Sequence, residues 1–252
     1  MGALHEGHLS LVRQAKRECR RVVVSIFVNP LQFGPKEDYR RYPRDLKGDI
    51  ETLRPLGVDL VFAPTVASFY PKDFQTTVSV GKLSEPLCGR FRPGHFQGVA
   101  TVCAKLFHSV EPDRAYFGEK DFQQLRVIEQ FIEDLNLDVQ IRRHPTVRER
   151  DGVAMSSRNR TLSPQNRKVA SLLYQALSSG RSAIRRGEKR PGVIAALMRR
   201  TVRKSRRIRV DYLEAVNPVD LSAPLRLKGK VLLAGAIRIG RTRLIDNLLV
   251  KC

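Results

Sequence analysis

Apolar and polar positions alternate in blocks along the first 146 residues. Apolar residues recur at roughly helical spacing over 9–19 and predict a helix there. The next block, Val22–Val28, is almost continuously apolar and stops at Asn29-Pro30. Such a run is typical of a parallel strand that is buried on both faces.

The same alternation continues to about residue 146. Helices are predicted over 45–56, 98–110 and 121–135, the last with Asp121 as its cap, and strands over 58–63, 115–117 and 139–143. Because strands that alternate with helices usually form parallel sheets, the pattern predicts an α/β fold: a parallel sheet wrapped by helices.

The pattern changes after Pro145-Thr146-Val147. A polar loop over 148–163, whose first residues resemble mobile surface, leads to two helices, predicted over 164–187 and 191–205. Ser163 precedes Pro164, an arrangement typical of a helix start. Strands follow over 208–216, 230–239 and 243–250 and predict a small antiparallel sheet. We therefore expect two domains, 1–146 and a smaller α+β domain over 147–252.

Composition narrows the class of protein. The chain has 252 residues, of which 42% are hydrophobic, enough for a packed core. No stretch approaches the roughly 20 apolar residues that a membrane span needs, and the first residues lack the pattern of a signal peptide. The four scattered cysteines form no CxxC pair, which favours a reduced cytoplasm over a zinc or disulfide framework.

Charge divides the chain unevenly. Residues 1–147 carry 21 basic and 18 acidic side chains, whereas residues 148–252 carry 25 basic and 7 acidic ones. Such a half attracts polyanions, so a basic nucleic-acid-binding protein is one hypothesis, with a cluster of cations over 199–209 as its surface. Few aromatic residues stand among these cations to stack on bases. We therefore expect at most weak, nonspecific and salt-sensitive binding.

His5-Glu6-Gly7-His8 is the strongest local motif. It opens the first helix, and imidazoles three positions apart share one face of a helical turn. Free backbone N–H groups and the helix dipole at that end favour phosphate, and Gly7 permits close approach of a nucleotide. Two surface histidines remain an alternative, whereas no third ligand supports zinc.

Two further segments carry phosphate-binding chemistry. The segment 117–124 lies where a predicted strand passes into a helix, the edge at which ligands bind in open α/β folds. There Lys120 can neutralise phosphate charge, and Glu119 could orient Lys120 or a ribose. Ser156, Ser157 and Arg158 together offer donors to a triphosphate. Each segment alone is also compatible with an ordinary helix cap or an interdomain loop.

Taken together, these motifs resemble the pantothenate synthetase (pantoate–β-alanine ligase) family of the HxGH nucleotidyltransferase superfamily. The resemblance covers nearly the whole chain. It rests on 5–8, 27–33, 42–44, 92–96, 117–124, 145–149 and 155–159, in this order. It implies a cytoplasmic enzyme of coenzyme A biosynthesis with a Rossmann-like N-terminal domain and a smaller C-terminal lid domain, usually a homodimer.

The resemblance also implies a reaction. ATP activates (R)-pantoate as pantoyl-adenylate with release of pyrophosphate, and the amine of β-alanine then displaces AMP. Magnesium would be held mainly by the triphosphate, since this ion keeps phosphate and water ligands, and we expect no metal site made by the protein. An HxGH nucleotidyltransferase or an adenylate-forming enzyme for another acid is the alternative.

Motif by motif, the resemblance assigns roles to residues. Gln32 and Gln124 would hold pantoate, with Gln32 also near β-alanine. The groups expected to act on the reacting phosphates are His5, His8 (the usual proton donor), Lys120, Ser156, Ser157 and Arg158. The ATP site would be lined by Met1, Gly2, Ala3, Leu4, His5, Glu6, Gly7, His8, Gly118, Glu119, Lys120, Asp121, Val147, Met155, Ser156, Ser157 and Arg158.

The start of the chain departs from the family pattern. The family has a first strand and a Pro-Thr pair before the Met-Gly with which this sequence begins. We therefore expect a natural gene that starts upstream, with Met1 an internal methionine. We further expect a sheet that lacks this strand here; if Met1 is the true start, we expect the chain to bind ATP poorly.

Overall fold

The computed structural model describes residues 2–35 and 37–252, and it divides the chain into two compact units. Unit 1 comprises 1–84, 92–119 and 124–147, and unit 2 comprises 85–91, 120–123 and 148–252. Two short segments, 85–91 and 120–123, therefore belong with the C-terminal half of the sequence. None of the helices in the described part of the chain combines the length and apolar character that a bilayer crossing requires.

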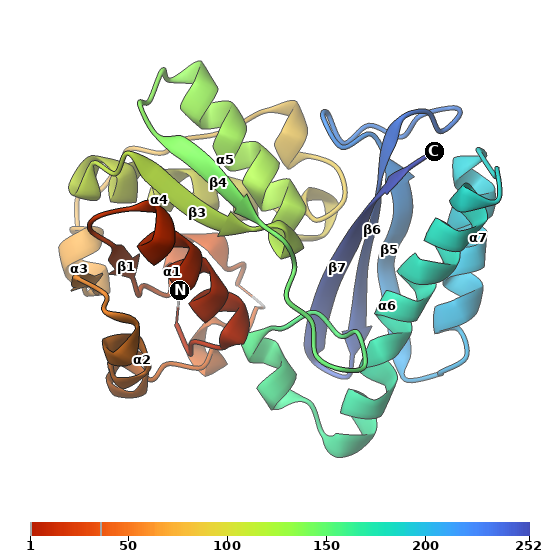
Figure 1. Cartoon of the computed structure of the whole chain (residues 1–252), viewed down its shortest axis with the longest axis horizontal. Coiled ribbons are helices and arrows are strands. Elements are labelled where there is room, and N and C mark those ends of the chain that lie inside the picture. Colours follow the sequence, from red (N-terminus) through yellow and green to blue (C-terminus); the bar gives the residue numbers. More distant parts are fainter. Residues whose placement is uncertain (1, 36) are drawn as a thin grey trace. The chain divides into compact units, whose positions relative to one another are not determined.

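Unit 1 is built from parallel strand pairs and helices (Figure 1). Its helices are α1 (Glu6–Glu18), α2 (Leu46–Leu53), α3 (Val66–Phe69), α4 (His95–Val110) and, apart from its first residues, α5 (Phe122–Asp134). Its strands are β1 (Val23–Ser25), β2 (Leu60–Phe62), β3 (Arg114–Gly118) and β4 (Gln140–His144). The predicted α/β class is confirmed.

The parallel strands form two separate pairs instead of one sheet. β1 pairs with β2, Val24 opposite Val61, and β3 pairs with β4, Tyr116 opposite Arg142. Helix α1 packs on both pairs: its Val12 and Ala15 join a buried cluster with Val24 of β1, and Tyr116 of β3 packs against that cluster. Glu18, at the end of α1, accepts a hydrogen bond from the Tyr116 hydroxyl at 3.0 Å.

The expected long buried strand over 22–28 is wrong in two respects. β1 spans three residues. Beyond Ser25 one further ladder bond forms, from the Ile26 N–H to the Phe62 carbonyl, and the partner segment then reaches Pro64. The strand is also buried on one face alone, since Val23 is 37% exposed whereas Val24 is 3% exposed.

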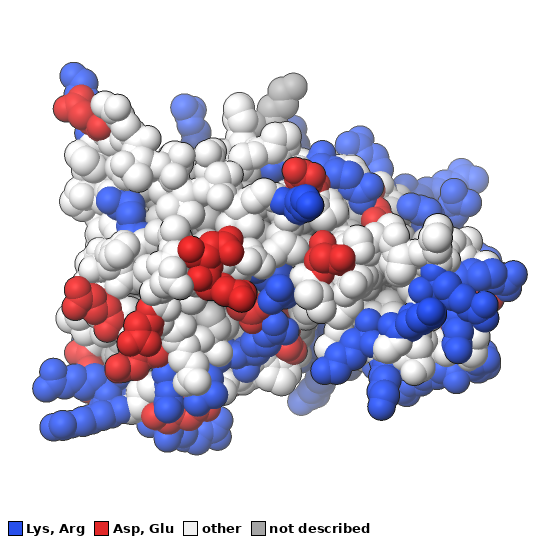
Figure 2. Space-filling model, turned by 90° about the horizontal axis from the view of Figure 1, so that it is seen from above, with Lys and Arg blue, Asp and Glu red and all other residues white. Residues whose placement is uncertain are grey.

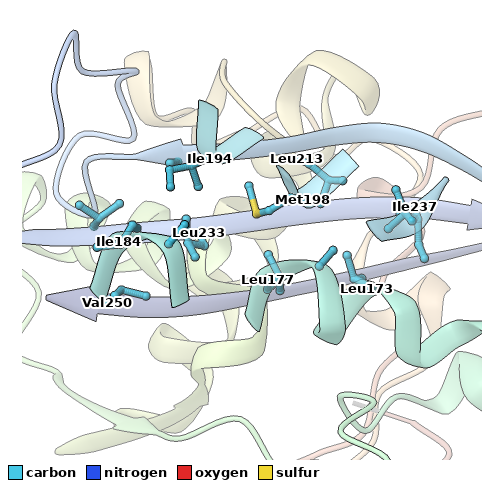
Figure 3. Close-up of a cluster of buried hydrophobic side chains, with 14 of the residues drawn as sticks. Leu173, Leu177, Ile184, Ile194, Met198, Leu213, Leu233, Ile237 and Val250 are labelled. Carbon is cyan, nitrogen blue, oxygen red and sulfur yellow. The ribbon is translucent and has the colours of Figure 1, made fainter. Parts of the chain in front are cut away.

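Unit 2 is a two-helix layer on a three-stranded antiparallel sheet. Helices α6 (Pro164–Arg185) and α7 (Pro191–Val202) lie against β5 (Ile208–Val216), β6 (Lys230–Ile239) and β7 (Thr242–Lys251). Figure 3 shows their shared core, to which Leu177 of α6, Met198 of α7 and Leu233 of β6 contribute. The predicted elements are confirmed to within three residues at each end, and the Ser163 hydroxyl caps α6 through the Asn166 N–H at 3.3 Å.

The loop expected over 148–163 contains more structure than its polar sequence indicates. A short 3-10 helix, η7, spans Ser157–Thr161, and Arg148 forms an isolated antiparallel bridge with Ala154. Arg167 of α6 pairs with both Glu149 and Asp151, each at 2.6 Å. Ion pairs and this bridge thus contact the first residues of the loop, whose mobility stays a prediction.

Candidate active site

The two histidines of the HxGH motif lie together at the start of α1. His5 has an extended backbone, with φ −144° and ψ 171°, and its carbonyl accepts the N–H groups of His8 and Leu9 at 2.7 and 3.1 Å. The imidazole rings of His5 and His8 are stacked, with centroids 4.0 Å apart. The predicted placement on one face is confirmed. Glu6 instead pairs with Arg13, whose hydrogen bonds hold the pKa of Glu6 below its ordinary value.

A buried carboxylate positions the backbone just before these histidines. Asp49 of α2 is 4% exposed and accepts hydrogen bonds from the N–H groups of Ala3 and Leu4, at 2.9 and 2.6 Å. Ala3 has a φ of +51°, a left-handed conformation that is unfavourable for alanine and needs such support. Sequence reasoning missed Asp49, because nothing in the local pattern marks a helical aspartate as a partner for backbone 45 residues away.

Gln32 lies in a short 3-10 helix, η1 (Pro30–Gln32), whose backbone is held from several sides. The Gln32 carbonyl accepts from Nη2 of Arg92 at 3.1 Å and lies 2.8 Å from Nδ1 of His95. Since a carbonyl only accepts, Nδ1 of His95 donates. Its Nε2 lies 2.9 Å from the Arg92 guanidinium, which only donates, so Nε2 accepts.

Arg92 is in turn fixed by Glu37. The two side chains form a forked pair, Nε to Oε1 at 2.7 Å and Nη2 to Oε2 at 2.6 Å. Burial raises the pKa of Glu37, but the hydrogen bonds and charge of Arg92 outweigh burial and leave this pKa below its ordinary value. The motif over 92–96, to which sequence reasoning assigned no role, thus supports the backbone of Gln32.

Helix α4 approaches this segment closely. A Cβ atom on Gly98 would lie 2.3 Å from the Leu31 carbonyl oxygen and 2.7 Å from the Gln32 N, so only glycine fits. The Asn29 side chain donates to the Gly98 carbonyl at 2.9 Å and lies 3.4 Å from the amide oxygen of Gln32. Gln32 is therefore presented by a preorganised backbone.

In unit 2, Lys120 lies in the 3-10 turn η6 (Glu119–Asp121), which follows Gly118 at the end of β3. Its ammonium group is 3.6 Å from Asp121, and its carbonyl accepts from the side chain of Asn247 at 2.9 Å. A Cβ on Gly118 would meet nothing within 4 Å, so the backbone there is open on that side.

The serine-arginine motif, residues 155–158, lies at the start of η7. The Ser156 hydroxyl accepts from the Arg158 N–H at 3.3 Å and caps this helix, while Ser157 is 2% exposed. Met155 and Arg158 are partly buried. The segment thus has a defined conformation in which the two serines differ: Ser156 is a cap and Ser157 is buried.

The remaining predicted residues are scattered over unit 1. Met1 lies outside the described residues. Gly2 is buried, and a Cβ atom on it would lie 3.1 Å from a Val28 methyl group, which is a tight contact. Gln124 is half-buried in the first turn of α5, and Val147 is the last residue of unit 1.

Positive charge gathers on the C-terminal half of the chain. Figure 2 shows Lys and Arg side chains crowded over the surface of unit 2. Six of the seven carboxylates over 148–252 are paired with arginines; they are Glu149, Asp151, Glu188, Asp211, Glu214 and Asp246. The exposed cations over 199–209 form no ion pair within the described part of the chain, and no aromatic residue stands among them.

A family model for pantoate–β-alanine ligase matches residues 1–249. The chain belongs to the pantoate–β-alanine ligase family. A pantothenate synthetase of Caldicellulosiruptor bescii is 52% identical over 251 residues, which cover 100% of this chain and 89% of that protein. A pantoate–β-alanine ligase structure from Thermus thermophilus superposes with a TM-score of 0.96 at 50% identity, covering 98% of this chain and 90% of the other.

A further structure of a pantoate–β-alanine ligase, from Francisella tularensis, is described as a complex with beta-gamma ATP and β-alanine. It has a TM-score of 0.82 at 34% identity and covers 99% of this chain and 87% of the other. The resemblance inferred from the motifs is therefore confirmed, and the ligase fold extends over both units of this chain.

The first prediction concerns the support of the HxGH backbone. Asp49→Ala leaves two buried N–H groups without their acceptor, and each such loss costs about 1–3 kcal/mol. We expect the free energy of unfolding, measured with urea, to fall by about 2–4 kcal/mol. Glu51→Ala, in the same helix but exposed, is the control and should change it by less than about 0.5 kcal/mol. Equal, small losses in both variants would contradict this role of Asp49.

Proposed function

We propose that this chain condenses pantoate with β-alanine to pantothenate at the expense of ATP. The main support is that the ligase family model matches residues 1–249. This match includes every motif named above. In the first step, a pantoate carboxylate oxygen attacks the α-phosphorus of ATP, and the bond to pyrophosphate breaks. In the second, the β-alanine nitrogen attacks the acyl carbon, the bond to AMP breaks, and the nitrogen loses a proton.

The residues of unit 1 supply side-chain amides and imidazoles. Gln32 and Gln124 would hold pantoate, because neutral amides pair with its hydroxyls and carboxylate without bringing a full opposing charge. The fixed backbone of Gln32 supports this role, since substrate must be held in a reactive geometry. His5 and His8 would face phosphate at the N-terminus of α1, where backbone N–H groups and the helix dipole add to them, and His8 would donate a proton there.

The residues of unit 2 supply charge. Lys120 and Arg158 would stabilise the negative charge that builds up on phosphate oxygens, with the hydroxyls of Ser156 and Ser157 as further donors. Because the Ser156 hydroxyl caps η7 and Ser157 is buried, both hydroxyls would have to turn to contact ATP. Gly118, Glu119, Asp121, Val147 and Met155 would complete the contacts to ATP, together with residues 1–7.

Magnesium would enter with ATP as part of the substrate, held mainly by the triphosphate. The polar side chains of the proposed ATP-binding residues fit this view: they are two cations, two hydroxyls, two imidazoles and three carboxylates, of which Glu6 is paired with Arg13. We also propose a cytoplasmic homodimer in which residues 147–252 act as the lid domain, as the family resemblance implies.

The reaction is tested by isotope exchange between ATP and pyrophosphate. We expect exchange to require pantoate, because pantoyl-adenylate formation is the reversible first step, and we expect pantothenate to form when β-alanine is added. Exchange that is independent of pantoate but is stimulated by another carboxylic acid would contradict the proposal. That result would indicate an adenylate-forming enzyme of different specificity.

A second prediction concerns Lys120. Removing one preorganised charge donor typically costs on the order of 100- to 1,000-fold in rate, so Lys120→Ala should slow pantoate-dependent exchange by that factor. Its thermal unfolding should change little, since the ammonium group forms its ion pair with a half-exposed Asp121. Lys230→Ala, an exposed lysine of the same unit, should keep wild-type exchange. A Lys120→Ala enzyme with near wild-type turnover would exclude Lys120 from the site.

A third prediction separates pantoate from ATP. Loss of hydrogen bonds to a charged substrate costs about 1.5–3 kcal/mol, which corresponds to roughly 10- to 150-fold in affinity. Gln32→Ala should therefore raise the KM for pantoate by about that factor, with the KM for ATP within about twofold of wild type. Gln97→Ala, exposed on α4, is the control. A change confined to the KM for ATP would refute the assignment of Gln32 to pantoate.

A further inference from the structure

Two adjacent polar residues are buried in the middle of β7. Asp246 is 4% exposed and Asn247 is 8% exposed, whereas the buried residues near them on this strand are Leu244 and Val250. A buried carboxylate or amide is costly unless hydrogen bonds replace its water. Because successive side chains of a strand point to opposite faces, these two residues serve the two faces of the sheet separately.

Asn247 holds the segment that carries Lys120. Its side-chain N–H donates to the Lys120 carbonyl at 2.9 Å. Asn247 pairs in register with Ala234 of β6, which lies opposite Glu214 of β5. On the same face Glu214 pairs with Arg90, so the short segments 85–91 and 120–123 are both attached to this sheet.

Asp246, on the other face of the sheet, binds Arg148. The guanidinium of Arg148 makes a forked pair with Asp246 at 2.6 and 2.9 Å, and its two nitrogens donate to the carbonyls of Gly152 and Asn247 at 3.0 and 3.2 Å. It also lies over the ring of Tyr174, 4.4 Å from the centroid. Burial raises the pKa of Asp246 above its ordinary value, while the Arg148 charge opposes that shift.

From Arg148 the restraint continues to the serine-arginine motif. Arg148 is bridged to Ala154, the residue just before Met155. On the other side of the motif, the Asn159 side chain donates to Glu149 at 2.7 Å and to the Ala154 carbonyl at 3.1 Å. Residues 155–158 are thus closed into a loop whose two ends are tied to each other and, through Arg148, to β7.

We propose that Asp246 and Asn247 are positioning residues that set the spacing between Lys120 and the 155–158 loop, and thereby the affinity for the triphosphate of ATP. The inference rests on the proposed function, because it takes Lys120 and residues 155–158 as ATP ligands. A strand is a more rigid support than the loops that it holds. One dipeptide on β7 therefore positions both segments relative to each other, although neither of its side chains needs to touch ATP.

Asn247→Ala is the central experiment. It removes the bond to the Lys120 backbone and leaves the Lys120 side chain present. Since a misplacement of about 1 Å costs up to about 100-fold, we expect kcat/KM for ATP in pantoate-dependent exchange to fall about 10- to 100-fold. The KM for pantoate should stay within about twofold of wild type, because Gln32 and Gln124 belong to the other unit.

Two control variants on the same strand separate positioning from stability. Leu249→Ala removes an exposed side chain from the same face as Asn247 and should keep wild-type kinetics. Leu248→Ala removes apolar contacts with the core and should lower the unfolding temperature while leaving the KM for ATP unchanged below that temperature. If Leu248→Ala reproduces the kinetic defect of Asn247→Ala at equal stability, Asn247 is merely structural and the inference is overturned.

A double-mutant cycle tests whether Asn247 acts through Lys120. In a Lys120→Ala background, Asn247→Ala should cause less than about a twofold further loss, since coupled residues are not additive. Full additivity would overturn the inference. Arg148→Lys tests the other arm: it keeps the charge but loses the fork, and it should weaken ATP while sparing pantoate. An unchanged KM for ATP in Arg148→Lys would likewise count against it.

Failure of this inference and failure of the proposed function have different outcomes. Wild-type exchange that requires pantoate, together with an unchanged KM for ATP in Asn247→Ala, would overturn the inference and leave the function standing. If wild-type protein shows no exchange, the proposed function fails. Direct titration with MgATP then decides the inference: weaker binding by Asn247→Ala supports it, and equal affinity or no binding by wild type overturns it.

Discussion

A buried carboxylate must find hydrogen-bond donors to replace water, and each unit of this ligase-family chain uses that requirement to hold a motif in place. In unit 1, Asp49 accepts two backbone N–H groups immediately before the HxGH histidines. In unit 2, Asp246 accepts the fork of Arg148 and so restrains the loop that contains Ser156 and Arg158. Both aspartates lie on regular elements, α2 and β7, which are stiffer than the segments that they hold.

The two units differ in the residues that support the proposed site side chains. In unit 1 the support of Gln32 depends on Gly98, His95 and the pair Arg92–Glu37. In unit 2 the supports are the forked pair Arg148–Asp246 and the side-chain amides of Asn247 and Asn159. The roles proposed for the side chains that they hold differ in the same way: amides would select pantoate by hydrogen bonds, whereas cations would stabilise the charge that develops on phosphate.

The excess of arginine in unit 2 goes beyond these supports. Arginines take up almost all the carboxylates of residues 148–252, and the exposed cations over 199–209 are left without an ion-pair partner in the part of the chain that the structure describes. The ligase reaction does not require this surface. It produces a positive potential that attracts anions of any kind, ATP included, with a strength that salt reduces.

Local pattern alone determined much of this protein. The period-two and helical patterns of unit 2 predict β5 and β6 to the residue, and the Ser163 cap of α6, because these features depend on neighbours a few positions away. The joint order of the motifs likewise identified the family. Tertiary structure decided what depends on distant partners: the separation of the parallel strands into two pairs, the one-sided burial of β1, and the assignment of Lys120 to the unit of β7. Asp49 and Asn247 act on backbone 45 and 127 residues away, and no local pattern encodes such contacts, since their energy exists only once the chain has folded.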